Sequence, residues 1–398
     1  MTQPDFDRIR PYRDDEVASV LDDWVTSPKL RNVVRRAGVT ALFRLPLIGT
    51  FLARLWLKKQ LSGVRTVDEL QQVIAPWVEK LFDSTTDSVT SNGLENLSSR
   101  KPCLFLSNHR DIVTDPAVVN FLLYREGFAT TRIAIGDNLT EDPLVSDLMR
   151  LNKSFIVRRN LTSPREMRDV YLTLSAYIRD SIESGHSVWL AQREGRAKDG
   201  IDVTDPAIIK MLYMSHKRDK RSLCEAIESL NLVPVAVSYE VDPCDAGKAR
   251  EVEARARTGT YKKKPAEDIE SIIRGITGYK GRIHVAFGKP LSGEFSSPHA
   301  VAEAVDRQIL DLYRFFPVNF AAAEKLLTRG DLIALPEAIR ERMPDRPEMQ
   351  KAHAWLDRRM QPEPSALHPY MLGIYANPLL RHFGSDGIKI QEERENND

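Results

Sequence analysis

Apolar positions along the chain follow two spacings, one typical of helices and one typical of buried strands. A helical spacing that begins with Val67, Leu70 and Val73 predicts a helix over residues 66–90. A turn is expected at 91–93, and the apolar run at 102–107 then predicts a buried strand. Similar runs predict strands at 131–135, 154–158, 187–191, 233–239 and 282–287. Helical patterns lie between them at about 116–125, 143–151, 164–184, 205–215 and 222–230.

This alternation predicts the fold class. Strands that alternate with helices indicate an α/β domain with a mostly parallel sheet flanked by helices, and we place it at residues 90–292. Residues 1–89 are expected to form an N-terminal helical region. Only helical patterns follow residue 296, so residues 293–398 are predicted to be a helical C-terminal extension with a charged, disordered tail.

Composition narrows the class of protein. The chain has 398 residues, 42% of them hydrophobic and 28% charged, and a formal net charge of +1. Such values are typical of a globular chain, and the near-neutral charge argues against a general nucleic-acid binder. The three cysteines, Cys103, Cys224 and Cys244, are too far apart for a disulfide framework. With a polar, acidic N-terminus unlike a signal peptide, they predict a cytoplasmic protein.

Charge is unevenly distributed despite the even total. Nine basic residues and no acidic one lie in the segment 29–65. Its most apolar window, 37–57, contains Arg44, Arg54 and Pro46, which argues against a membrane-spanning helix. A basic, apolar segment with aromatic residues instead predicts peripheral association with anionic lipid on the inner face of a membrane. The alternative is a pair of core-packing helices whose arginines are solvated.

A second basic segment spans residues 248–264 and contains seven basic and two acidic residues. It separates the strand predicted at 233–239 from the one at 282–287. One interpretation is a solvated insertion. The other is a cationic patch for anionic lipid, the phosphates of a ligand or an acidic protein.

A histidine follows the strand predicted at 102–107. Ligands of a parallel sheet bind beyond the carboxyl ends of its strands, which is where His109 is expected to lie. Either Asp111 or Asp115 could hold its imidazole as a general base. Asp115 also has a purely structural interpretation, because Asp-Pro at the start of a helical run is typical of an N-cap with Pro116 at the first helical position.

Four segments in order resemble the motifs of the glycerolipid acyltransferases. Residues 108–110 with Asp115 resemble the His-x4-Asp motif, with one extra residue between histidine and aspartate. Residues 154–159 resemble the second motif, an apolar strand that ends in arginine, and residues 194–196 resemble the Glu-Gly-x-Arg turn, one residue short. Residues 232–239 resemble the fourth motif, a strand that opens on Val-Pro. The resemblance covers roughly residues 90–292.

The resemblance implies transfer of a fatty acyl chain from acyl-CoA or acyl carrier protein to a hydroxyl of a glycerol-phosphate or lysophospholipid, without a further cofactor. It implies His109 as general base, with Asp115 favoured over Asp111 as its partner. The cations expected to bind a substrate phosphate are Arg158, Arg159 and Arg196, with Arg193 and Lys198 as competitors because the third motif is short. Residues expected to support the substrate are Glu194, Gly195 and Asn108.

Other chemistries find less support. The chain lacks a Gly-x-Ser-x-Gly elbow, so we expect direct transfer rather than a covalent acyl-enzyme. No second His/carboxylate cluster accompanies His109, so no metal site is predicted. Two alternatives remain: O-acylation of an amino-acid lipid, and a catalytically inactive membrane-binding adaptor. The sequence leaves the donor, acceptor position, chain length and oligomeric state open.

Overall fold

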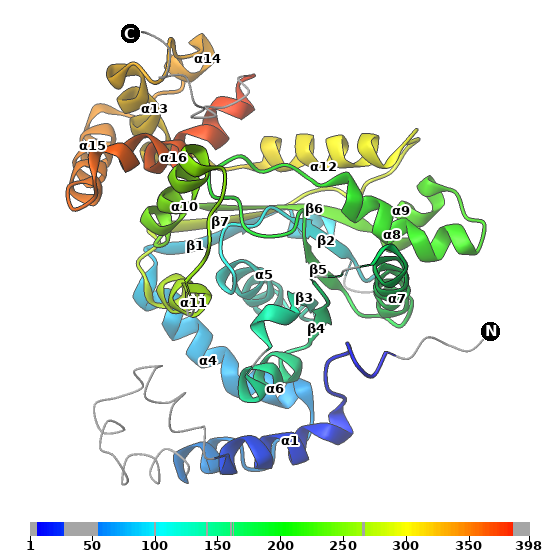
Figure 1. Ribbon diagram of the computed structural model, residues 1–398. Coiled ribbons are helices and arrows are strands. Elements are labelled where there is room, and N and C mark those ends of the chain that lie inside the picture. Colours follow the sequence, from blue (N-terminus) through cyan, green and yellow to red (C-terminus); the bar gives the residue numbers. More distant parts are fainter. Residues whose placement is uncertain are drawn as a thin grey trace.

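A computed structural model describes residues 6–27, 55–98, 101–140, 142–159, 161, 163–264 and 267–384. Its centre is a seven-stranded sheet of order β1-β7-β6-β2-β5-β3-β4 (Figure 1). The paired strands run parallel except β6 and β7, which are antiparallel. This confirms the predicted α/β class with a mostly parallel sheet. The strands are β1 (Ser88–Asn92), β2 (Leu104–Ser107), β3 (Arg132–Gly136), β4 (Ser154–Val157), β5 (Val188–Ala191), β6 (Leu232–Tyr239) and β7 (Arg282–Phe287).

Helices cover both faces of this sheet, as the side-chain alternation along a strand requires. In β2, Leu104 and Leu106 enter one core, whereas Phe105 enters the core on the opposite face. The first core is closed by α7 (Pro164–Glu183), α8 (Pro206–Arg218), α9 (Leu223–Leu230) and α12 (Pro298–Leu312). The second is closed by α4 (Val67–Thr85) and α5 (Thr114–Arg125), on the side opposite α12 in Figure 1.

The helix expected over 66–90 is shorter than predicted. It is α4, which begins after a capping box between Thr66 and Glu69 and ends at Thr85. Residues 88–92 instead form β1, which pairs with β7 through Val89 and Ile283. The correction has a tertiary cause, since a partner almost two hundred residues away decides the conformation of this segment.

The N-terminal region contains α1 (Asp14–Thr26) and a helical stretch at 55–60. Residues 28–54, which hold most of the basic segment, lie outside the described residues. Between β3 and β4 lies α6 (Pro143–Leu151), which packs against β4 and α1. Along the described ranges no helix is long and apolar enough to cross a membrane.

The segment between β6 and β7 folds into α10 (Asp245–Thr258) and α11 (Glu267–Thr277), two helices that the sequence patterns did not predict. Beyond β7 the described residues form helices and turns only, as expected. After α12 these are α13 (Pro317–Arg329), α14 (Glu337–Arg340), α15 (Arg346–Met360) and α16 (His368–His382). They enclose a core of their own, to which Leu326, Leu356 and Leu379 belong. The expected disordered tail falls within residues 385–398, outside the described part.

Candidate active site

The candidate site lies at the carboxyl ends of four adjacent strands. His109 follows β2 by two residues, and the order β2-β5-β3-β4 places the loops after these strands at one edge of the sheet. Side chains from all four loops, including His109, Asn138, Arg159 and Arg196, line a cavity of about 120 Å³. The site therefore forms where a parallel sheet is expected to bind its ligand.

His109 is held by a buried carboxylate. Its Nδ1 lies 2.8 Å from Oδ2 of Asp115, which is 0% exposed, whereas the histidine side chain retains 13% exposure. An ionised carboxylate can only accept a hydrogen bond, so it places the proton on Nδ1 and leaves Nε2 as the basic nitrogen. The imidazole also packs edge-on against Trp189, with ring centroids 5.7 Å apart. A histidine held in this way is equipped to act as a general base.

Asp115 has a full set of hydrogen-bond donors. Its Oδ2 also accepts from the backbone N–H of Arg110 at 2.6 Å and of Asp111 at 2.9 Å. Its Oδ1 accepts from the hydroxyl of Tyr239, at the end of β6, at 2.7 Å. Burial and the neighbouring Asp115 raise the pKa of Tyr239 well above its ordinary value, so the phenol keeps its proton and donates. Sequence reasoning missed Tyr239, although it lies in the segment that resembles the fourth motif.

Asp111 has a different task from Asp115. Its Oδ1 accepts from the backbone N–H groups of Val113 at 3.1 Å and Thr114 at 2.8 Å, and so satisfies the first turn of α5. The expectation that Asp115 caps a helix beginning at Pro116 is wrong, because α5 begins at Thr114. The helix begins two residues earlier than Asp-Pro suggests, which places Asp115 inside the helix, where its carboxylate faces His109.

Asn108 is engaged by the protein itself. Its amide nitrogen donates to the carbonyl of Val237 at 3.0 Å, and its amide oxygen accepts from the N–H of the same residue at 2.7 Å. The side chain thus continues the β2–β6 ladder by two hydrogen bonds after β2 has ended. In the structure Asn108 fixes the start of the His109 loop, rather than lying free for a substrate as expected.

The predicted phosphate-binding cations separate into two groups. Arg159, Arg193, Arg196 and Lys198 line the cavity of His109. Arg158 lines a different cavity, where its Nη2 donates to Glu166 at 2.7 Å. The two adjacent arginines after β4 therefore lie in different cavities, and of the two only Arg159 lines the cavity of His109.

The loop after β5 presents Arg196 to the cavity. Gly195 adopts φ +75°, a left-handed conformation that a glycine accepts without strain. The Nη1 atom of Arg196 is buried and has no hydrogen-bond partner among the described residues. A buried, unpaired donor on a cation is a strong indication of an anionic ligand. Glu194 is exposed and lies 3.5 Å from Nε of Arg159, which agrees with a role in holding that arginine.

The insertion between β6 and β7 reaches the same site. Lys263 and Asp268 line the cavity, although neither had been identified as a site residue. Lys198 is ion-paired with Glu251 of α10, and burial lowers its pKa. A second cavity of about 230 Å³ adjoins the first through Arg196 and Lys198. The basic segment at 248–264 is thus a wall of the site rather than a detached loop.

A buried polar network supports the loop that carries His109. Nη2 of Arg110 donates to the hydroxyl of Tyr313 at 3.0 Å, and Nε of Arg110 lies 3.8 Å from Oδ2 of Asp202. The carbonyl of Arg110 accepts from Nζ of Lys248 at 2.6 Å. Arg110 therefore ties the loop to the C-terminal helices, and its backbone ties it to α10. Sequence patterns do not indicate this network, because its members lie far apart along the chain.

Comparison with known proteins shows which family part of this chain resembles. Residues 88–238, from β1 almost to the end of β6, match the family model described as Acyltransferase. The chain is 22% identical over 306 residues to a glycerol-3-phosphate acyltransferase of Pseudomonas syringae pv. tomato. Residues 88–238 are therefore similar to the acyltransferases. A glycerol-3-phosphate acyltransferase of Pseudomonas putida (strain GB-1) is 23% identical over 231 residues, which cover 57% of this chain.

The relatives that the chain matches are much longer. The P. syringae alignment covers 70% of this chain but 35% of that protein, so the chain spans about a third of its relative. The corresponding share of the P. putida protein is 26%. Among solved structures, the 1-acyl-sn-glycerophosphate (LPA) acyltransferase PlsC from Thermotoga maritima is 14% identical, with a TM-score of 0.37. That alignment covers 75% of this chain and 96% of the T. maritima chain.

Proposed function

We propose that the protein transfers a fatty acyl chain from a thioester donor to a hydroxyl of a glycerol-phosphate or lysophospholipid acceptor. The observation that carries the proposal is a single cavity that holds both His109, paired with Asp115, and the cations Arg159, Arg193 and Arg196. A base and a phosphate site in one cavity are what acylation of a phosphate-bearing alcohol requires.

In the proposed mechanism, Nε2 of His109 removes the proton of the acceptor hydroxyl as its oxygen attacks the thioester carbonyl. The new C–O bond forms, the C–S bond breaks, and the proton returns from the imidazolium to the departing thiolate. Asp115 stabilises the imidazolium during this cycle. Cys103 and Cys244 are unsuited to form an acyl-enzyme, because burial raises the pKa of both thiols to about 11. These features support direct transfer.

The proposed acceptor site rests on cation geometry. Planar guanidinium groups bind a phosphate through two parallel hydrogen bonds, and Arg196 has a buried Nη1 with no partner in the described part of the chain. Arg159 reaches the cavity from β4 and Arg193 from β5, so the phosphate would be held from two strands. We expect the acceptor phosphate to bind here, with its hydroxyl near His109.

The donor is proposed to bind along the neighbouring cavity. Arg250, Lys264 and Arg274 line it, and it adjoins the His109 cavity through Arg196 and Lys198. Cations along this path suit the phosphates of acyl-CoA or an acidic acyl carrier protein. No further cofactor is proposed.

We further propose that the protein works at the anionic inner face of a membrane. Leu55 is 50% exposed, and the indoles of Trp56 and Trp77, 36% and 41% exposed, stack at 5.2 Å between ring centroids. Lys58 and Lys59 lie on the same short helical stretch. Indoles beside lysines are typical of side chains at a bilayer interface. Sedimentation with phosphatidylglycerol vesicles, weakened by Trp56→Ser/Trp77→Ser, would support this; equal sedimentation of both proteins would contradict it.

The test of the transfer reaction is thiol release from palmitoyl-CoA or palmitoyl-acyl carrier protein. Glycerol-3-phosphate, lysophosphatidate and a hydroxyacyl amino-acid lipid serve as acceptors. Activity with either of the first two that falls at least about 1,000-fold in His109→Ala supports the proposal. The control is His299→Ala, since this histidine is 72% exposed on α12. Transfer only to the amino-acid lipid would show that the acceptor belongs to that other class of lipid. No transfer with any acceptor would favour an inactive adaptor.

A further inference from the structure

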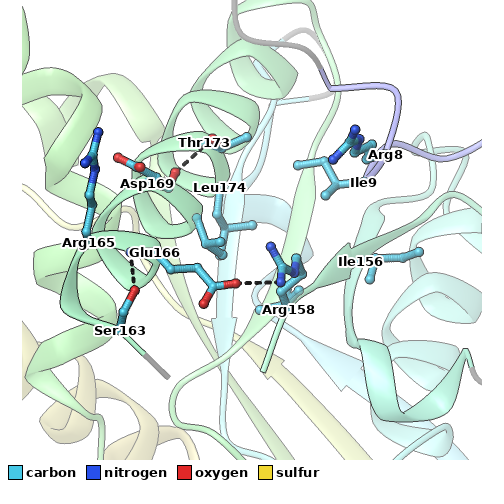
Figure 2. A pocket seen from close by; sticks show the side chains of 12 residues that line it. Arg8, Ile9, Ile156, Arg158, Ser163, Arg165, Glu166, Asp169, Thr173 and Leu174 are labelled. Atoms are coloured by element: carbon cyan, nitrogen blue, oxygen red, sulfur yellow. Dashed lines mark hydrogen bonds and ion pairs between the residues drawn. The ribbon is translucent and has the colours of Figure 1, made fainter. Parts of the chain in front are cut away.

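A third cavity lies on the other side of β4 from His109. It measures about 450 Å³, within the usual range for small-molecule sites. Figure 2 shows its walls, formed by β4, the first turns of α7 and the N-terminal segment that contains Arg8 and Ile9. None of its lining residues lines the His109 cavity, so the two are separate sites.

The interior of this cavity is apolar. Ile9, Ile156, Val157, Val170 and Leu174 contribute the aliphatic part of its lining. The N-terminal segment is fixed to the sheet here, because the N–H of Ile156 donates to the carbonyl of Ile9 at 2.9 Å. An aliphatic cavity with a fixed wall can receive an alkyl chain through burial of apolar surface alone.

The rim carries more positive than negative charge. Its cations are Arg8, Arg158 and Arg165, and its acids are Glu166 and Asp169. Glu166 is paired with Arg158, whereas no ion pair is found for Arg8 or Arg165 among the described residues. In Figure 2, Arg8 and Arg158 lie toward one side of the cavity, and Arg165 and Asp169 lie toward the other. An anionic group would therefore bind between Arg8 and Arg158.

We propose that this cavity binds a single-chain anionic amphiphile, with its head group between Arg8 and Arg158 and its alkyl chain against Ile9, Val170 and Leu174. The chemistry shared by the candidate ligands is one alkyl chain with a carboxylate or phosphate at its end. The proposal goes beyond the transfer reaction, because it requires neither His109 nor the cations beside it. A ligand here would also contact Arg158, whose chain neighbour Arg159 enters the active site.

The test is calorimetric titration of the full chain with dodecanoate, dodecyl phosphate and neutral dodecyl maltoside, each below its micelle concentration. Because an amphiphile could also enter the active site, each titration is repeated in an Arg196→Gln background. We expect at least one of the two anions to bind at least about tenfold more tightly than the maltoside. Arg8→Gln/Arg158→Gln should weaken that binding at least about tenfold. The control Arg168→Gln, on α7 but outside the cavity, should not weaken it.

A cavity-filling variant tests the alkyl site independently of charge. Val170→Trp should abolish the same binding event, with folding checked by circular dichroism. If this variant is misfolded, the titration of Arg8→Gln/Arg158→Gln, which changes two exposed side chains, tests the proposal. Equal affinity for the neutral amphiphile, no binding of either anion, or unchanged binding in Arg8→Gln/Arg158→Gln would each overturn the proposal. Dodecanoate alone would indicate a fatty acid and dodecyl phosphate alone a lysolipid. Each of these binding outcomes can be interpreted whether or not His109→Ala loses acyl transfer.

Discussion

The hydroxyl of Tyr239 donates to Oδ1 of Asp115 at 2.7 Å, while Oδ2 of the same carboxylate faces His109. Tyr239 is the last residue of β6, a strand that is buried along its whole length and paired on both sides. The carboxylate that orients the histidine is therefore hydrogen-bonded to a fully buried strand that is paired on both sides. The loop supplies the histidine, and the central strand supplies its alignment.

Removing this hydroxyl should misalign the pair without unfolding the protein. Tyr239→Phe leaves Oδ1 of the fully buried Asp115 without a donor, which should cost about 1–3 kcal/mol of unfolding free energy. We expect kcat to fall roughly tenfold, because Asp115 and His109 can then shift together. Urea unfolding and initial rates measure the two effects. A variant as active and as stable as the native protein would show that Tyr239 plays no part in alignment.

The two aspartates of the loop should respond differently to the loss of charge. Asp115→Asn places a donor or a neutral oxygen against Nδ1 of His109, and the imidazole loses the tautomer that leaves Nε2 basic. We expect kcat to fall about 1,000-fold or more. Asp111→Asn keeps an oxygen that can cap Val113 and Thr114, so its rate should fall less than tenfold. The opposite order would make Asp111 the functional partner.

The adjacent arginines after β4 provide a matched comparison for the phosphate site. Arg159 enters the cavity of His109, and Arg158 enters the cavity on the other side of the strand. Arg159→Gln should raise KM for a phosphate-bearing acceptor at least about tenfold more than Arg158→Gln does, since one charge-assisted hydrogen bond is worth roughly 1.5–3 kcal/mol. Steady-state kinetics at saturating thioester measure it. Equal effects would mean that both side chains reach the acceptor.

The local patterns predicted most of the sheet and missed what depends on distant partners. Buried strands such as β2 and β6 are short apolar runs, so residues 102–107 and 233–239 were found within two positions. β1 was read as the end of a helix, because only its pairing with β7 makes it a strand. Residues 245–258 have few apolar positions, since α10 buries Lys248 and Glu251 in ion pairs instead. Apolar periodicity cannot detect a helix of that kind.

The sequence predicts those features of the site that lie within a single loop. Strand order brings the loops of His109, Arg159 and Arg196 to one edge, and this follows from parallel strands alone. The choice between Arg158 and Arg159 needed the register of β4, and the choice between Asp111 and Asp115 needed the start of α5. Both depend on shifts of one or two residues. Sequence periodicity does not define element boundaries that closely.

A buried histidine outside the site should make stability depend on pH. Both ring nitrogens of His216, on α8, are buried without a partner in the described residues. Burial lowers its pKa to about 4, with Arg179 and Arg221 adding to the effect against Glu183 and Asp219. Below pH 6.5 this histidine binds a proton in the unfolded chain but not in the folded chain. Stability therefore falls as the pH drops from 6.5 toward 4.

The variant His216→Phe should reduce that loss by roughly 1–3 kcal/mol, because no proton is then taken up on unfolding at this position. The measurement is urea unfolding at pH 7.5 and pH 5, compared between the native chain and the variant. His299→Phe, at an exposed position on α12, serves as the control and should leave the difference unchanged. An identical pH dependence in His216→Phe would show that this histidine is protonated in the folded state.

Lys248 offers a test of the network beneath the site. Its side chain is 2% exposed, pairs with Asp242 and donates to the carbonyl of Arg110. Burial alone would raise the pKa of Asp242, but Lys248, the N–H of Cys244 and Arg110 together outweigh burial, and the pKa lies below its ordinary value. Lys248→Met leaves this carboxylate buried without its cation, so we expect a loss of roughly 3–5 kcal/mol of unfolding free energy. The rate should also fall, since the loop next to His109 loses an anchor.

The double variant Lys248→Met/Asp242→Asn separates these two effects. Neutralising Asp242 removes the uncompensated charge, so most of the stability should return, whereas the hydrogen bond to Arg110 stays absent and the rate should stay low. Urea unfolding and kcat are measured on the same preparations, with Lys351→Met, at an exposed position on α15, as control. If stability and rate recover together, α10 supports the fold alone. If only stability recovers, α10 positions the loop that carries His109.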